Sequence, residues 1–165
     1  MWTIIKADQK NLSILKKEFE NKIGEGVKIY SPKLLIKKYK KNKFIEREFN
    51  LLGDYLFCFH SAFEKKEMIN FLKFTRGLKY FLEGFSQSQN DIKKFIEKCK
   101  QSENKKGYLT QKFFEIYENN NYKFISGPFS EKIFKIINFQ KNKIEILLGD
   151  IKTTIKSKDY SFAPL

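Results

Sequence analysis

The stretch FNLLGDYLFCFH, residues 49 to 60, decides how the chain folds. A Gly-Asp pair separates two apolar runs, which indicates a turn between extended segments. After this turn Tyr55, Phe57 and Phe59 occupy alternate positions, and alternate side chains of a strand point to the same face. That face is either core or a contact surface. Aromatic alternation favours core, whereas a few rigid rings in a groove are typical of a protein interface.

On either side of this stretch, strands and helices alternate through the first hundred residues. Helices are predicted where apolar residues recur every three or four positions, and Ser61 with Glu64 and Ser88 with Asp91 have the spacing of N-terminal capping boxes. Three helices are predicted: one begins at Leu12 and ends at Gly24, the second spans residues 61 to 77, and the third spans residues 88 to 99. Strands are predicted at residues 2 to 5, 27 to 36 with a break at Pro32, 44 to 49, 54 to 60 and 78 to 82.

The last third of the chain has a different pattern. Residues 100 to 107 are polar without an apolar period, which marks a domain boundary, and residues 108 to 117 have no clear assignment. From Tyr122 onward, short extended runs alternate with Gly-Pro, Gln-Lys-Asn and Gly-Asp turn signals. This pattern predicts a small all-β barrel.

The composition limits the functional classes. The 165 residues include 33 Lys and Arg against 19 Asp and Glu, a formal net charge of +14, which favours a polyanionic partner or an acidic protein surface. Only two of the basic residues are arginines, and codon bias in an A/T-rich genome would give the same balance. No apolar segment approaches bilayer length and none resembles a signal sequence, so a cytoplasmic protein without a membrane segment is expected.

Enzymatic chemistry has little support in the sequence. Cys58 and His60 lie two positions apart on one strand, a possible thiol and imidazole pair. No third orienting group and no phosphate-binding glycine loop accompany them, so a buried cysteine beside a structural histidine is the preferred interpretation. Cys58 and Cys99 lack metal-ligand spacing. We therefore expect neither an enzyme nor a metal or other cofactor.

Four short motifs, in order along the chain, resemble the NusG family of bacterial transcription elongation factors, including its RfaH-like members. They are Trp2 in an opening strand, LLGDYLF at 51 to 57, TRGL at 75 to 78, and GPF at 127 to 129. The resemblance covers nearly the whole chain. Gly53 and Asp54 stand where the family usually has Pro-Gly, and Phe134 replaces the second glycine of the KOW motif, which indicates a divergent paralogue.

The resemblance implies an α+β fold: an antiparallel NusG N-terminal-like (NGN) sheet flanked by helices in residues 1 to 100, a linker in 101 to 119, and a KOW (SH3-like) β-barrel in 120 to 165. It implies a monomeric elongation or antitermination factor whose first domain binds the clamp helices of RNA polymerase and reduces pausing. Tyr55 and Phe57 are the expected polymerase contacts. The barrel would recruit a second factor, such as a ribosomal protein or Rho, with Phe134 and Ile136 as candidates and core packing expected for one of them.

Basic residues are the candidates for nucleic-acid contact. The KKYKKNK segment at 37 to 43 is expected to be an exposed loop, which either reaches upstream or non-template DNA phosphates or is a solvated hairpin tip. Arg76 either contacts phosphate or complements a helix dipole. The alternative function is a general RNA-binding or ribosome-associated KOW-domain protein, in which basic and aromatic residues bind nucleic acid directly. The candidate residues are Lys37, Lys38, Lys40, Lys41, Lys43 and Arg76.

Overall fold

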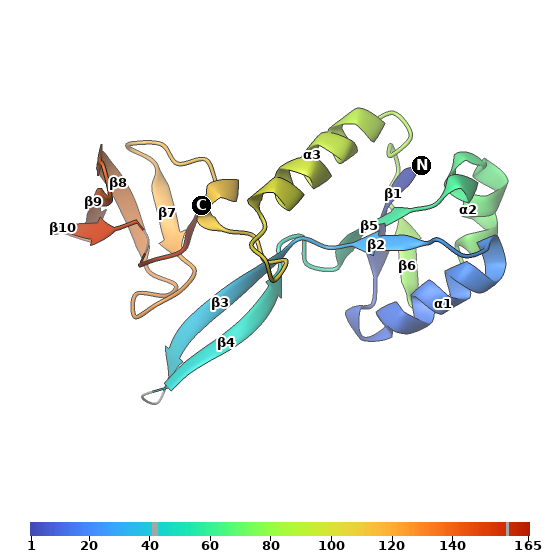
Figure 1. Ribbon diagram of the computed structural model, residues 1–165, viewed down its shortest axis with the longest axis horizontal. Helices are drawn as coiled ribbons and strands as arrows, with labels where there is room; N and C mark the ends of the chain where they lie inside the picture. Colours follow the sequence, from blue (N-terminus) through green and yellow to red (C-terminus); the bar gives the residue numbers. More distant parts are fainter. Residues whose placement is uncertain (41–42, 158) are drawn as a thin grey trace. The chain divides into compact units, whose positions relative to one another are not determined.

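The computed structural model describes residues 1–40, 43–157 and 159–165 (Figure 1). The chain divides into two compact units: Met1–Pro32 with Asn50–Cys99, and Lys33–Phe49 with Lys100–Leu165. Residues 33 to 49 group with the second unit in this division, whereas the sequence placed them in a first domain of residues 1 to 100. The division into a first domain that ends at residue 100 and a second that begins at residue 120 stays a prediction.

The first unit is built on an antiparallel sheet with the strand order β2-β5-β1-β6. Strand β5 lies beside β1, with Trp2 opposite Phe59 and Lys6 opposite Tyr55, so the alternating aromatic segment Tyr55–Phe59 is an inner strand of the sheet. Strand β6 pairs with the other side of β1. All four strands were predicted; their bounds are β1 (Trp2–Ala7), β2 (Lys28–Tyr30), β5 (Tyr55–Phe59) and β6 (Leu78–Phe81).

One face of this sheet is covered by α1 (Leu12–Ile23) and α2 (Lys66–Leu72) (Figure 1). The predicted stripe of α1 is confirmed, because Leu15 and Phe19 are fully buried. Helix α1 ends as predicted at Gly24, whose φ of 92° suits glycine and whose N–H donates to the Glu20 carbonyl. The buried residues on this face are Ile5, Ala7, Leu15, Phe19, Val27, Leu56, Cys58, Phe63, Ile69, Leu72 and Phe81.

The start of α2 differs from the predicted capping box. His60, not Ser61, caps the short 3-10 helix Ser61–Glu64 that precedes α2, because the His60 side chain accepts a hydrogen bond from the Ala62 N–H at 3.2 Å. A histidine ring nitrogen serves as the acceptor that the serine hydroxyl was expected to supply.

The other face of the sheet is partly covered by α3 (Gln89–Ser102) (Figure 1). Gln89 attaches the beginning of this helix to β1: its side-chain oxygen accepts from the Trp2 N–H at 3.0 Å, and its amide nitrogen donates to the Trp2 carbonyl at 2.7 Å. Ile92 and Ile96 are buried against Phe57. The predicted helical face is thus confirmed, although the helix extends to Ser102 through residues expected to be linker.

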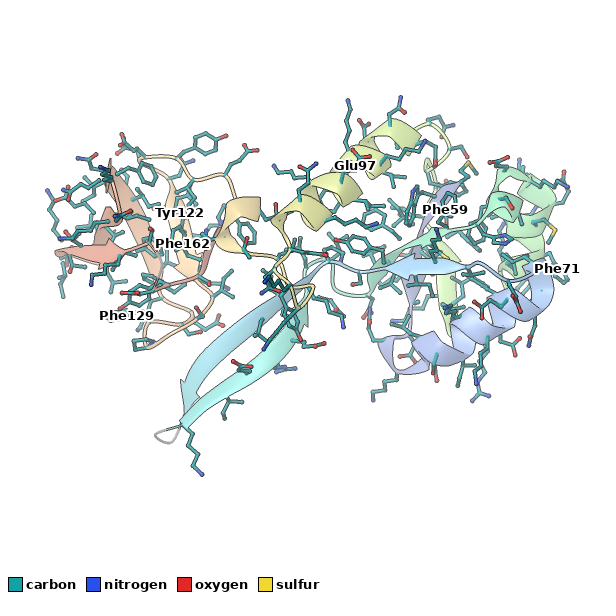
Figure 2. All side chains as sticks on the ribbon, in the orientation of Figure 1. Phe59, Phe71, Glu97, Tyr122, Phe129 and Phe162 are labelled. Carbon is teal, nitrogen blue, oxygen red and sulfur yellow. The ribbon has the colours of Figure 1, made fainter. Side chains whose placement is uncertain are left out.

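The second unit contains the predicted all-β tail, an antiparallel sheet with the order β10-β9-β8-β7-β11. Its edge strands supply Ile155 and Phe162 to a single core, so the sheet curls around that core, where Figure 2 labels Tyr122 and Phe162. Phe134 and Ile136 are both buried; the expectation of different roles was wrong, because residues two apart on a strand share a face. The bounds are β7 (Asn121–Phe124), β8 (Ile133–Gln140), β9 (Lys143–Leu148), β10 (Ile151–Lys156) and β11 (Phe162–Pro164).

The second unit also contains a two-stranded sheet of β3 (Lys33–Lys40) and β4 (Lys43–Asn50). Its base is held by Glu48, which accepts from Lys33 at 3.0 Å and from the Tyr108 hydroxyl at 2.5 Å. The Tyr108 bond, followed by the bond to Lys33, lowers the pKa of the Glu48 carboxyl. The Glu48 bond in turn raises the pKa of Tyr108. The predicted α+β class, antiparallel sheets with helices followed by an all-β segment, is confirmed.

Candidate functional site

An apolar hollow of about 540 Å³ lies beside α3 on the sheet of the first unit. Residues of β1 and β5, together with Leu52 and Leu82 outside the strands, form one wall; Ser88 and the first two turns of α3 form the other. Tyr55 and Phe57 both line it, so the two predicted contact residues are brought together at one site. The lining consists of Ile4, Leu52, Tyr55, Phe57, Leu82, Ser88, Asp91, Ile92 and Phe95.

Tyr55 occupies the open side of the hollow. Its side chain is half-buried, and its hydroxyl is 2.8 Å from the hydroxyl of Tyr80 on β6. The hydrogen bond to Tyr80 raises the pKa of Tyr55, so this phenol is neutral at physiological pH. The Lys6 ammonium lies 5.3 Å from the Tyr55 ring centroid and 5.8 Å from that of Tyr80. Both distances are within the range of a cation–π interaction.

Phe57 is far more enclosed than Tyr55. Only 4% of its surface is exposed, and its ring centroid lies 5.6 Å from that of Phe95 and 6.3 Å from that of Tyr30. With Ile92 and Ile96 it forms the core beneath α3. Phe57 therefore belongs to the protein's own core and presents only an edge to the hollow.

Sequence reasoning missed several residues of the site. Tyr80 and Leu82 remain 42% and 38% exposed at the open edge, and neither was singled out. The alternation in LKYFL at 78 to 82 indicates that they share a face. What the alternation does not give is the pairing of β6 with β1, which places that face next to Tyr55. Lys6 and Asp91 were also missed as neighbours of the hollow.

The predicted nucleic-acid residues fall in two places. Lys37, Lys38 and Lys40 lie within strand β3, so the expectation of a loop there was wrong. Lys41 lies outside the described residues, and Lys43 is exposed at the start of β4. Arg76 is in the first unit, exposed in the turn between α2 and β6. The hairpin residues and Arg76 belong to different units, and their role in binding stays a prediction.

Cys58 and His60 have separate structural roles. Cys58 is fully buried in the core under α1 and α2, and burial raises the pKa of its thiol to about 12. It is therefore protonated at neutral pH, which does not suit a nucleophile. His60 caps the 3-10 helix, and its Nε2 is 3.2 Å from the Glu25 carbonyl. The interpretation of Cys58 as a core cysteine is confirmed.

Within the described ranges, no cluster of three or more His, Cys, Asp or Glu side chains is arranged to hold a metal ion. In the same part of the chain, every helix is too short or too polar to cross a bilayer.

No protein-family model matches the sequence, and no curated protein sequence does either. Among solved structures, the MjSpt4:Spt5 complex aligns over 100% of this chain and 98% of that chain, with 13% identity and a TM-score of 0.31. NusG of Thermotoga maritima, solved in work on its domain interaction, aligns over 94% of this chain and 91% of that chain, with 15% identity and a TM-score of 0.34. These scores are low, and we draw no inference from either likeness.

Proposed function

We propose that this protein is a transcription elongation factor that binds RNA polymerase through the apolar hollow beside α3. The polymerase clamp helices, a coiled coil of the largest subunit, would insert apolar side chains between Tyr55 and the α3 wall. Binding there would reduce pausing without any bond being made or broken. The factor would act on its own as a monomer, and its KOW-like segment, residues 120 to 165, would contact a second factor.

The hollow is the observation that supports this proposal most. A space of about 540 Å³ with a mainly apolar lining stays open on a sheet face that α3 covers only in part. Exposed apolar surface next to a concavity is typical of protein-binding grooves. The ordered motifs from Trp2 to GPF at 127 to 129 point to the same family independently of the hollow.

Binding of the full chain to core bacterial RNA polymerase tests the proposal directly. Tyr55→Ala and Leu82→Ala remove exposed lining and should each weaken binding about tenfold, the effect of losing a typical interface anchor. Tyr117→Ala and Ile151→Ala are matched controls, because these side chains are 56% and 67% exposed in the second unit. Equal affinity for the hollow variants and their controls would exclude this docking site.

A pausing template gives the functional readout. The wild-type chain should shorten the dwell time of polymerase at pauses, and Tyr55→Ala should lose this effect at protein concentrations where Tyr117→Ala retains it. Unchanged dwell times with saturating wild-type protein would contradict the proposed activity even if polymerase binding were observed.

The basic residues fit a secondary role in this proposal. The lysines of 37 to 43 and Arg76 would contact phosphates of upstream or non-template DNA. Replacing Lys43 or Arg76 by Gln should weaken binding to a polymerase with a DNA bubble and leave binding to core polymerase unchanged. Both side chains are exposed, so the substitutions should leave the fold intact.

The alternative, a general RNA-binding or ribosome-associated KOW protein, differs in its salt dependence. Binding through phosphates falls steeply as counterion concentration rises, whereas docking in an apolar hollow persists. Affinity for free RNA that exceeds affinity for polymerase, and that disappears at moderate salt, would favour the alternative.

A further inference from the structure

A lysine is held in place on β1, next to Tyr55 of the hollow lining. Lys6 lies on β1 opposite Tyr55, and its ammonium is positioned by the two tyrosine rings at 5.3 and 5.8 Å. The rings are in turn joined by the 2.8 Å bond between the hydroxyls of Tyr55 and Tyr80. A side chain that is already ordered loses less conformational entropy when a partner binds it.

Among the described residues, this lysine has no carboxylate as a counterion. The nearby Asp54 is paired with Lys79 at 2.9 Å. Within the described part of the chain, no carboxylate lies within ion-pair distance of the Lys6 ammonium. A positive charge is thus fixed beside an apolar surface, and a carboxylate from outside the chain would complement it.

The helix wall carries the opposite charge. Asp91 lines the hollow from the first turn of α3, is exposed, and makes no ion pair with any base among the described residues. A carboxylate in the first turn of a helix also complements the helix dipole. The dipole explains why an acidic residue occurs in this turn, but it does not explain why that residue lines the hollow. A cation therefore lies beside the lining residue Tyr55, and a carboxylate lies on the α3 wall.

We propose that Lys6 and Asp91 fix the direction in which a partner helix lies in the hollow. The occupant is an amphipathic helix of a partner protein, whose apolar ridge fills the hollow, with a carboxylate facing Lys6 and a basic side chain facing Asp91. An apolar surface alone attracts without selecting a direction, whereas charges at opposite walls favour one orientation over its reverse. This inference rests on the proposed function, since the partner is taken to be RNA polymerase.

Charge reversal separates this arrangement from a general charge effect. Lys6→Glu and Asp91→Lys should each weaken binding of the full chain to core polymerase about tenfold, because each replaces an attraction with a repulsion. Lys6→Arg keeps the cation over the rings and should bind like wild type. If only net charge mattered, Lys6→Glu and Asp91→Lys would change affinity in opposite directions, which would overturn the proposal.

The double variant Lys6→Glu with Asp91→Lys has the wild-type net charge. Weaker binding than that of either single variant would support the proposal. Restored binding without any shortening of pauses would also support it, because the partner helix would then bind in the reverse direction. Wild-type binding together with wild-type pausing activity would overturn it. Lys10→Glu and Glu97→Lys make the same charge changes at exposed positions outside the hollow lining, on the 3-10 helix Gln9–Asn11 and on α3 (Figure 2), and should leave affinity unchanged.

Tyr55→Ala distinguishes failure of this inference from failure of the proposed function. Loss of binding in Tyr55→Ala, with all charge variants at wild-type affinity, would overturn the directional role and leave the docking site standing. Wild-type binding by Tyr55→Ala would overturn both. Thermal unfolding followed by Trp2 fluorescence checks that each variant is folded before its affinity is interpreted.

Discussion

Truncating Phe57 should destabilise the first unit far more than truncating Tyr55, although both rings lie on the same face of β5. Phe57 is 4% exposed and is packed against Ile92, Ile96 and the ring of Phe95. Replacing a buried Phe by Ala removes its transfer free energy and leaves a cavity, a loss of about 3–5 kcal/mol. Tyr55 is half-buried, so Tyr55→Ala should reduce the free energy of unfolding by only about 1 kcal/mol.

The assay is urea unfolding followed by the fluorescence of Trp2, the only tryptophan of the chain. Trp2 lies on β1 in the first unit, with its ring centroid 5.2 Å from that of Phe59, so its signal reports this unit. A local probe is needed because two compact units can unfold in separate transitions. Phe74→Ala is the matched control: Phe74 is 93% exposed, and its removal should change stability by less than about 0.5 kcal/mol.

Similar losses of stability for Phe57→Ala and Phe74→Ala would refute the assignment of Phe57 to the core. The expected difference also matters for binding experiments. A variant that loses about 3–5 kcal/mol of a typical stability of about 5–15 kcal/mol has a substantial unfolded population in the less stable cases. A double substitution of Tyr55 and Phe57 would therefore mix loss of contact with loss of fold, whereas Tyr55→Ala and Leu82→Ala separate them.

Three further predictions concern stability. Gln89→Ala should cost about 1–3 kcal/mol and increase hydrogen exchange of the Trp2 amide, because it leaves the hydrogen-bonding groups of Trp2 without their side-chain partner. Gly77→Ala should lower the melting temperature more than Gly84→Ala: both glycines have positive φ, but an added Cβ at 77 would lie 3.1 Å from a side-chain carbon, and at 84 it meets nothing within 4 Å. The pKa of the Glu48 carboxyl is lower in the folded state than in the unfolded state. The ionised carboxylate therefore stabilises the fold above the unfolded-state pKa, and this stabilisation is lost as the pH falls through the folded-state pKa. Glu48→Gln should reduce the pH dependence of the free energy of unfolding in that acidic range.

Local periodicity was enough to predict the regular elements. The stripe from Leu12 to Gly24, the face from Ile92 to Cys99 and the alternation after Gly53 each specify an element whose buried side follows from spacing alone. The errors came where a residue acts through a partner that spacing does not reveal. His60 takes the capping position expected of Ser61, and the lysines after residue 36 continue a strand because β4 pairs with them. Pairing between strands decided the second case, whereas the first is a local cap that a histidine ring nitrogen supplies.

The candidate site shows the same limit. Its centre was predicted, because the alternation of Tyr55 and Phe57 put both on one face. The boundary of the site was not predicted. Leu82 reaches the hollow through the pairing of β6 with β1, and Asp91 reaches it through the position of α3. A strand pattern gives the face to which a side chain points but not which neighbouring strand or helix stands over it.

The position of α3 explains why two rings of one strand face have different surroundings. Gln89 attaches the helix to the Trp2 end of β1, and the helix then packs over Phe57, while Tyr30 and Ile4 lie at the margin of its core. Tyr80 on β6 and Leu82, just after that strand, gain no comparable cover and stay 42% and 38% exposed. A helix with one apolar face can cover about two strands, since strands lie about 4.8 Å apart and a helix is about 10 Å across. A four-stranded sheet served by one helix on this face therefore keeps an apolar margin, and the hollow opens at that margin.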